Sequence, residues 1–255
     1  MTELRKFQLK LLKMLKEIDK ILKDENISYF LVGGSVLGAI RHRGFIPWDD
    51  DIDIGLYRKD FEKMEKILQE KLPLNLIYCK IGENKIPNAP IGYLYDISNP
   101  EIPLIETVTI DIFAIDNVPE SRILKKVQAT FSKIYHLCIY RTPAKNRGKK
   151  AYYFTKLVLD LFPNFLLNFL QNLSKKVITH WNNNETEDIC NLFGMKKYYK
   201  EIMPRKYIGN PVLKEFEGDL FPIPEQWDKY LTHLYGDYMK LPPKELQKPH
   251  HKDFE

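Results

Sequence analysis

One segment near the N-terminus constrains the fold more than any other part of the chain. Residues 29–32 form a short apolar run that ends in Gly33-Gly34-Ser35. Such a run is typical of a buried strand that enters a tight turn, and the Ser35 side chain can cap a helix over residues 36–42. After a loop, residues 51–56 alternate polar and apolar side chains, which indicates a second strand. The order strand, glycine turn, helix, loop and strand predicts a mixed α/β unit.

Helices and further strands surround this unit in the sequence. Residues 4–22 place apolar side chains at helical spacing with lysines on the other face. The other expected elements are a helix at 59–72, strands at 74–81, 91–97 and 107–113, and helices at 123–140, 152–181 (broken at Pro163) and 225–235. We expect an α+β fold, with a mixed sheet core flanked by helices and a helical elaboration in the second half. Residues 1–118 would form the core, and residues 119–255 the helical elaboration and a C-terminal segment that packs back on it in one compact unit.

Composition narrows the class of protein. Hydrophobic residues make up 44% of the chain and aromatic residues 13%, which is enough for a sizeable core and excludes global disorder. The three cysteines, Cys79, Cys138 and Cys190, are far apart and form no CxxC pair, so neither a disulfide framework nor a zinc site is supported. A net charge of +5 suits an anionic substrate or membrane surface but is too diffuse to indicate nucleic acid. No apolar run is long enough to span a bilayer, and we expect a reducing, cytoplasmic compartment.

The acidic strand indicates a cation site. Asp49, Asp51 and Asp53 share one face if the strand begins early enough, because every second side chain of a strand points the same way, whereas Asp50 points elsewhere. Three like charges on one face repel, and a fold that keeps them there usually holds a cation. Asp111 lies in an apolar, β-branched run, where a lone charge is costly unless it is paired or metal-bound. Oxygen ligands from such a cluster suit Mg²⁺ or Mn²⁺.

The glycine turn suits a phosphate group. Glycine lets the backbone approach a ligand closely, and the N-terminus of the following helix presents N–H groups and a positive dipole end. Arg41, His42 and Arg43 lie at the far end of that helix and can reach phosphates or an acceptor. A Gly-Gly-Ser turn or an acidic run alone is common in ordinary turns and solvated loops. Their combination with a later aspartate on another strand indicates a catalytic metal site.

Residues 32–56, with the sequence VGGSVLGAIRHRGFIPWDDDIDIGL, resemble the signature of the LicD family, which also includes fukutin and fukutin-related protein. Residues 216–243, FEGDLFPIPEQWDKYLTHLYGDYMKLPP, followed by His250-His251, are similar to the closing segment of bacterial members. Residues 119–200 carry little that matches. The cysteine-rich zinc site of the animal fukutin-related proteins has no counterpart here, so the bacterial branch is the better comparison.

The resemblance implies a nucleotidyltransferase-like fold and a Mg²⁺-dependent reaction. The reaction would move a phospho-alcohol from a CDP-linked donor to a sugar hydroxyl and release CMP. In bacterial members the group is most often phosphocholine and the acceptor a teichoic acid or lipopolysaccharide sugar, while related members transfer ribitol phosphate or glycerol phosphate. Carried onto this chain, the metal ligands are Asp51, Asp53 and Asp111, with Asp49 in a supporting role, and the Gly-Gly-Ser turn holds donor phosphates. Asp111 is also the candidate general base.

Some residues have two interpretations. If the donor is CDP-choline, a quaternary ammonium must be recognised, and aromatic faces do this; most of the available aromatics would nevertheless be ordinary core or surface residues. They are Trp48, Tyr93, Tyr95, Trp227 and Tyr235. His250 and His251 can bind phosphate or the acceptor, or simply end a docked tail.

Residues 154–173 are apolar with basic flanks. We favour packing on the core, and the alternative is a helix lying on the inner face of the cytoplasmic membrane, where a lipid-linked acceptor would be met. Two other functions stay open: a nucleotidyltransferase acting on a small molecule, and a non-catalytic nucleotide- or glycan-binding module.

Overall fold

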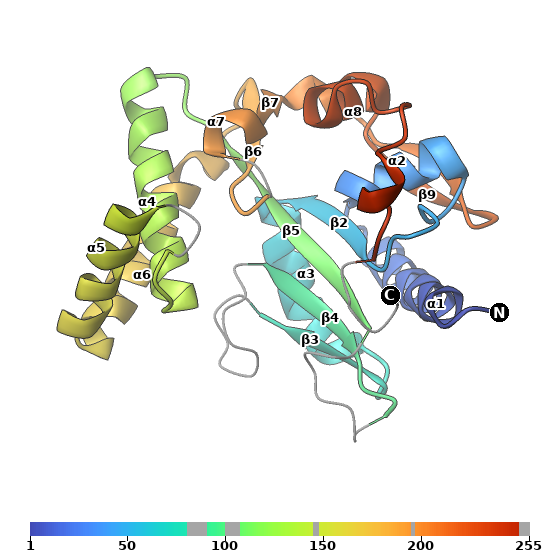
Figure 1. The fold of residues 1–255 in the computed structure, drawn as a ribbon, viewed down its shortest axis with the longest axis horizontal. Coiled ribbons are helices and arrows are strands. Elements are labelled where there is room, and N and C mark those ends of the chain that lie inside the picture. The colour runs from blue at the N-terminus through green and yellow to red at the C-terminus, as the bar shows by residue number, and fades with distance from the viewer. Residues whose placement is uncertain (81–90, 100–107, 145–147, 195–196, 250–255) are drawn as a thin grey trace.

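The computed structural model describes residues 1–80, 91–99, 108–144, 148–194 and 197–249. Its centre is a twisted mixed sheet in the order β1-β2-β5-β4-β3, extended by β6 and β7 at one end of β5 (Figure 1). Only β2 and β5 run parallel, and the other neighbours in this sheet pair antiparallel. The strands are β1 (Phe30–Leu31), β2 (Ile52–Tyr57), β3 (Leu76–Cys79), β4 (Gly92–Asp96), β5 (Thr109–Asn117), β6 (Asp188–Asn191) and β7 (Ile202–Pro204). The expected α+β fold is confirmed.

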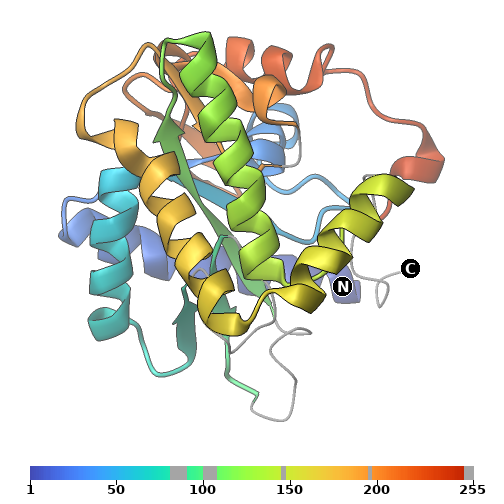
Figure 2. The same cartoon turned by 90° about the vertical axis from the view of Figure 1, so that its left-hand side faces the viewer.

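Helices cover the sheet and extend to one side of it. The three helices α4, α5 and α6 lie together on the side that faces the viewer in Figure 2. The C-terminal helix α8 lies near α2, although the two are far apart in sequence (Figure 1). The helices are α1 (Glu3–Asp24), α2 (Gly33–His42), α3 (Arg58–Lys71), α4 (Arg122–Tyr140), α5 (Lys149–Leu161), α6 (Asn164–Thr179), α7 (Tyr198–Glu201) and α8 (Trp227–Tyr235), with short 3₁₀ turns at His180–Asn183, Arg205–Tyr207 and Lys244–Leu246.

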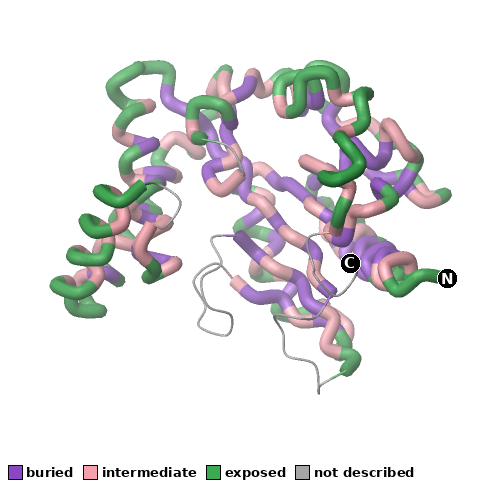
Figure 3. Tube along the Cα trace, in the orientation of Figure 1, coloured by how far each residue is buried: buried purple, intermediate pink, exposed green. Residues whose placement is uncertain are grey.

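The main core lies between α1, α3 and the sheet. The apolar face of α1 contributes Leu11, Leu15 and Ile18, all fully buried, as its helical spacing predicts. On β2, Ile52 and Ile54 are also fully buried, and the buried segments in Figure 3 follow this packing through the sheet. Because side chains alternate along a strand, burying these isoleucines turns Asp53 to the other face of the sheet.

The turn that enters α2 differs from the expectation. The helix begins at Gly33, so the glycines and Ser35 form its first turn, and its N-cap, Val32, makes no side-chain cap hydrogen bond. The predicted capping role of Ser35 is therefore wrong. Its buried hydroxyl instead accepts a hydrogen bond of 2.9 Å from the backbone N–H of Asp53. Gly33 adopts a φ of +56°, a left-handed conformation that favours glycine.

The last third of the chain is more regular than the sequence indicated. It contains β6 and β7 and a separate hairpin of β8 (Val212–Phe216) and β9 (Asp219–Ile223). The hairpin turns at Glu217-Gly218, where φ is positive at both residues, as in a type I′ turn. Glutamate is unusual there, but its carboxylate accepts hydrogen bonds from Arg5 and from the backbone N–H of Phe45. Tertiary contacts thus stabilise a turn that the local sequence does not predict.

A buried ion pair joins α3 to the sheet. The Arg58 guanidinium donates two hydrogen bonds to Asp116 on β5, of 2.8 and 2.6 Å, and the side chains are 6% and 0% exposed. Asn182 donates a third hydrogen bond, of 2.6 Å, to the same carboxylate. Removing one partner of such a pair leaves a buried charge without compensation.

We predict that Asp116→Ala lowers the free energy of unfolding by about 3–5 kcal/mol, because the Arg58 charge stays buried without its partner. The measurement is urea denaturation followed by circular dichroism. The double variant Arg58→Met/Asp116→Ala should recover part of the loss. A single variant as stable as the wild type would show that the pair contributes nothing.

Candidate active site

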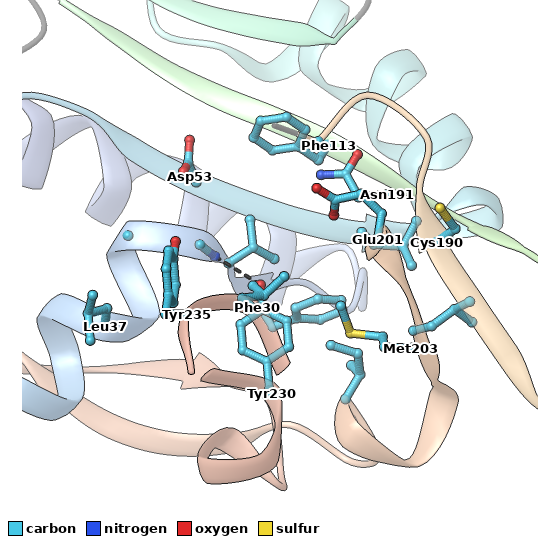
Figure 4. Close-up of a pocket in the computed structure, with 18 of the residues that line it drawn as sticks. Phe30, Leu37, Asp53, Phe113, Cys190, Asn191, Glu201, Met203, Tyr230 and Tyr235 are labelled. Atoms are coloured by element: carbon cyan, nitrogen blue, oxygen red, sulfur yellow. Dashed lines mark hydrogen bonds between the residues drawn. The ribbon is translucent and has the colours of Figure 1, made fainter. Parts of the chain in front are cut away.

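A cavity of about 510 Å³ opens between the sheet, the start of α2 and the C-terminal segment (Figure 4). Four segments far apart in sequence enclose it: residues 30–53, β5, the β6–β7 segment and α8. Its lining residues are Phe30, Val32, Gly33, Gly34, Leu37, Ile46, Asp49, Asp51, Asp53, Phe113, Ile115, Ile189, Cys190, Asn191, Gly194, Glu201, Met203, Ile208, Tyr230, Leu234 and Tyr235. The walls are mostly apolar and aromatic, with carboxylates at separate places.

Carboxylates gather where β2 meets β5. Asp53 and Asp111 are register partners on these parallel strands, so they lie side by side on the same face. The strand begins only at Ile52, so Asp49 and Asp51 lie in the preceding loop rather than on it. The pKa of Asp53 is raised well above its ordinary value, first by burial and then by the charges of Asp51, Asp111 and Asp49. The two loop aspartates therefore lie close enough to Asp53 to share its site. Asp50 is buried and, unlike Asp49, Asp51 and Asp53, does not belong to the cavity lining.

This cluster suits a cation without forming a finished metal site. In the described part of the chain, no three His, Cys, Asp or Glu side chains are already grouped as they would be around a metal ion. Burial, and after it the repulsion from the neighbouring carboxylates, raises the pKa of Asp53, and a divalent cation would relieve this repulsion. Carboxylate oxygens also match the preference of Mg²⁺ and Mn²⁺. The donor set therefore fits such an ion once the side chains turn toward it.

The first turn of α2 lies against these carboxylates. A Cβ atom at Gly33 would lie 3.0 Å from an Asp53 carboxylate oxygen, and one at Gly34 would lie 3.1 Å from an Asp49 oxygen. Because Gly33 and Gly34 carry no side chains, the backbone of α2 can approach Asp53 and the acidic loop closely. The Gly33 N–H donates a hydrogen bond of 2.9 Å to the hydroxyl of Tyr230 on α8, so the closing segment holds the turn in place.

Tyr235 brings a second hydroxyl to the cluster. Burial, and then the charges of Asp53, Asp49 and Asp51, raise the pKa of Tyr235. It therefore stays protonated at neutral pH and can donate a hydrogen bond toward an anion. Tyr235 was among the aromatic candidates, whereas Tyr230 was missed, because its contact with Gly33 joins positions nearly 200 residues apart.

The basic residues at the end of α2 lie outside the cavity lining, and Arg41 is the one with a tie to the acidic loop among the interactions described. Arg41 donates hydrogen bonds of 2.9 Å to the Tyr238 carbonyl and to the His42 ring. Burial lowers the pKa of Arg41, and the negative charge of Asp49 offsets part of this effect. Arg41 therefore lies close enough to the acidic loop to interact with it. Arg43 ends α2 in a left-handed conformation, and Trp48 packs edge-on against His42 at 6.3 Å between ring centroids. Within the described residues, none of these four side chains belongs to the cavity lining.

The remaining predicted binding residues fall in three places. Tyr93 is the register partner of Asp111, and burial, followed by the Asp111 charge, raises its pKa. Tyr95 packs against Tyr93, and Trp227 lies under Lys214 away from the lining described above. His250 and His251 lie outside the described residues.

The wall opposite Asp53 carries polar residues that the sequence analysis missed. Figure 4 shows Glu201 and Asn191 together on one side of the cavity and Asp53 on the other. The Glu201 side chain is buried, with 5% exposed. Burial is the main cause of the raised pKa of Cys190 and of Tyr235, and the Glu201 carboxylate adds to both shifts. No motif marks Glu201, because it stands in a short helix between two strands that were not predicted.

Comparison with known proteins agrees with this geometry. Residues 26–79 match the model of the LicD/FKTN/FKRP nucleotidyltransferase domain. The Lipopolysaccharide cholinephosphotransferase LicD of Haemophilus influenzae is 31% identical over 264 aligned residues, which cover 97% of this chain and 96% of that protein. The chain belongs to the LicD family. It is accordingly a phosphotransferase for substituted phosphate groups.

More distant LicD relatives share a shorter stretch. The murine and human proteins named Ribitol 5-phosphate transferase FKRP are each 45% identical over 47 residues, or 18% of this chain and 10% of either protein. The similarity to the Haemophilus LicD protein, by contrast, includes the segments that supply β6, β7 and α8. The comparison therefore covers both walls of the cavity.

We predict that Ser35→Ala lowers the free energy of unfolding by about 1–3 kcal/mol, because the backbone N–H of Asp53 loses its acceptor. Chemical denaturation measures the change. Ser121→Ala, at an exposed serine that makes no cap hydrogen bond, is the matched control and should stay close to the wild type. Equal stability of the two variants would show that the Ser35 hydroxyl does not hold the start of β2.

Proposed function

We propose that this LicD chain transfers phosphocholine from CDP-choline to a sugar hydroxyl of a cell-surface glycan, a lipopolysaccharide or teichoic acid precursor, and releases CMP. Transfer of ribitol phosphate or glycerol phosphate from the corresponding CDP-linked donor is the alternative. The near full-length similarity to a cholinephosphotransferase supports the first choice over the second, for which the similarity covers a short segment. A nucleotidyltransferase acting on a small molecule is the second alternative.

The observation that carries the proposal is the carboxylate cluster beside the first turn of α2. Asp51, Asp53 and Asp111, supported by Asp49, would hold Mg²⁺ or Mn²⁺, which supplies positive charge to the diphosphate of the donor. The N-terminus of α2 adds its own positive dipole end at the same place. These features favour a phosphate ester as the substrate of this cavity.

The reaction would exchange one phosphorus–oxygen bond for another. The acceptor oxygen bonds to the phosphorus that carries the choline, the bond from that phosphorus to the CMP oxygen breaks, and the acceptor proton passes to a carboxylate. We propose Asp111 as that carboxylate. We propose that the Tyr235 hydroxyl, which is protonated beside the cluster, donates a hydrogen bond to a phosphate oxygen during the reaction.

The cavity lining favours a cationic alcohol. Aromatic rings of Phe30, Phe113 and Tyr230 line the cavity, and Glu201 adds a buried carboxylate on the wall opposite Asp53. Aromatic faces attract a quaternary ammonium by about 0.5–2 kcal/mol each, and a carboxylate adds Coulomb attraction. A polyol such as ribitol could reach Asn191 and Glu201 but would leave its other hydroxyl groups against the apolar part of the lining, which costs binding energy. The lining therefore supports choline over ribitol or glycerol.

We predict CMP release from CDP-choline, in the presence of Mg²⁺ and a glycan acceptor extract, well above release from CDP-ribitol, CDP-glycerol or CDP-ethanolamine. EDTA should abolish the reaction, and Asp53→Asn should slow it by on the order of 10³-fold, because loss of an electrostatic contact to the transition state costs several kcal/mol. Chromatography of the nucleotide products makes the measurement. A nucleotide-modified acceptor in place of free CMP would identify the second alternative.

We also predict that Glu201→Gln raises KM for CDP-choline by roughly tenfold or more, because the choline cation loses a buried counter-charge. KM for CDP-glycerol, which carries no cationic alcohol, should change little. Glu215→Gln, on an exposed position of β8, is the matched control. Equal effects of Glu201→Gln on both donors would remove Glu201 from choline recognition while leaving the transfer reaction itself in place.

A further inference from the structure

The outer helices α5 and α6 present an apolar surface that the fold does not cover. Among the described residues of α5 none is buried, whereas α6 packs inward through Leu167, Ser174 and Ile178. Figure 2 shows both helices on the same outer side of the molecule, next to α4. Exposed segments run along the outside of α5 in Figure 3. The favoured expectation that residues 154–173 pack on the core is therefore wrong for α5 and right for only one face of α6.

Seven large apolar side chains form this surface, which we call the α5–α6 stripe. On each helix they recur at intervals of about one helical turn, so each set lies on one face. The two helices follow one another directly at Phe162-Pro163. The side chains and their exposed fractions are Tyr153 67%, Phe154 67%, Leu157 54%, Leu161 66%, Phe165 74%, Phe169 60% and Leu173 38%.

Single exposed apolar side chains are normal, but a grouped set marks an interaction surface. Four phenyl or phenol rings and two leucines on consecutive helices are more than half exposed, so they lack the stabilisation that burial would provide. In the described part of the chain no helix is long and apolar enough to cross a membrane. A grouped apolar surface of this kind calls for a binding partner.

Charge indicates which partner. Residues 149–179 contain five lysines against one aspartate. The lysines are exposed and stand at the start, middle and end of the stripe: Lys149, Lys150, Lys156, Lys175 and Lys176. An apolar face with aromatic and leucine side chains, bordered by lysines, is the pattern of a helix that lies in the headgroup region of an anionic bilayer.

A dimer formed through the α5–α6 stripe fits the positive charge of this surface less well. In a two-fold dimer the same patch meets itself, so the lysines would approach one another and repel. Anionic lipid headgroups would attract them instead, by an interaction that salt weakens. We propose that the α5–α6 stripe docks this protein on an anionic lipid surface as a peripheral contact. This inference does not depend on the proposed phosphocholine reaction.

The test is flotation of the full-length protein with vesicles. Mixed phosphatidylcholine–phosphatidylglycerol vesicles should carry the protein upward at low salt, pure phosphatidylcholine vesicles should carry much less, and high salt should release it. The triple variant Phe154→Ser/Phe165→Ser/Phe169→Ser should lose binding by roughly tenfold or more, because each ring contributes buried apolar area. The side chains are exposed, so an unchanged thermal melting curve is expected and confirms that the variant is folded.

The matched control removes three exposed leucines elsewhere, Leu74→Ser/Leu220→Ser/Leu246→Ser, and should float like the wild type. Failure of the wild type to float, or equal flotation of a folded stripe variant, would overturn the proposal. So would a dimer, seen by sedimentation, that the stripe variant loses while neither protein binds vesicles. In that case a second copy of the chain, rather than lipid, covers the stripe.

Discussion

Parallel pairing of β2 with β5 brings two carboxylates, Asp53 and Asp111, into register on neighbouring strands. The buried isoleucines on the opposite face of β2 fix the direction in which Asp53 points, and they do so through the same core that holds α1 and α3 against the sheet. Two further aspartates in the preceding loop add charge at the same point. The fold therefore concentrates negative charge at one place, and a bound cation would be the natural compensation.

The C-terminal segment completes the site that this pairing begins. The Tyr230 hydroxyl holds the backbone of Gly33, and Tyr235 faces the acidic cluster from the same helix. Across the cavity, β6 pairs with the end of β5 and brings the Glu201 wall into place. Each wall thus depends on contacts between residues far apart in sequence, and the similarity to the Haemophilus LicD protein extends over both.

Local patterns in the sequence were sufficient for the elements with strong periodicity. The amphipathic spacing of α1 and the alternation around Asp53 predicted a helix and a strand close to their observed bounds. Ser35 was placed correctly at the start of α2, but its role was not, because the acceptor it provides serves a strand 18 residues away. The strands β6 and β7 are too short for a period to show, and Glu201 between them has no motif. The exposure of α5 could not be predicted, because a helix that packs on a core shows the same apolar pattern as a helix whose apolar face is exposed.

Binding of Mn²⁺, followed by electron paramagnetic resonance during titration in the presence of CDP-choline, tests most directly whether the β2–β5 carboxylates share a divalent cation. The wild type should bind Mn²⁺ with loss of the free-ion signal, and Asp53→Asn and Asp111→Asn should each weaken that binding by roughly tenfold or more, because each removes one anionic ligand. Glu215→Asn, far from the cluster on an exposed strand, should leave it unchanged. Wild-type affinity in the Asp53→Asn and Asp111→Asn variants would contradict a metal-assisted site at the pairing of these two strands.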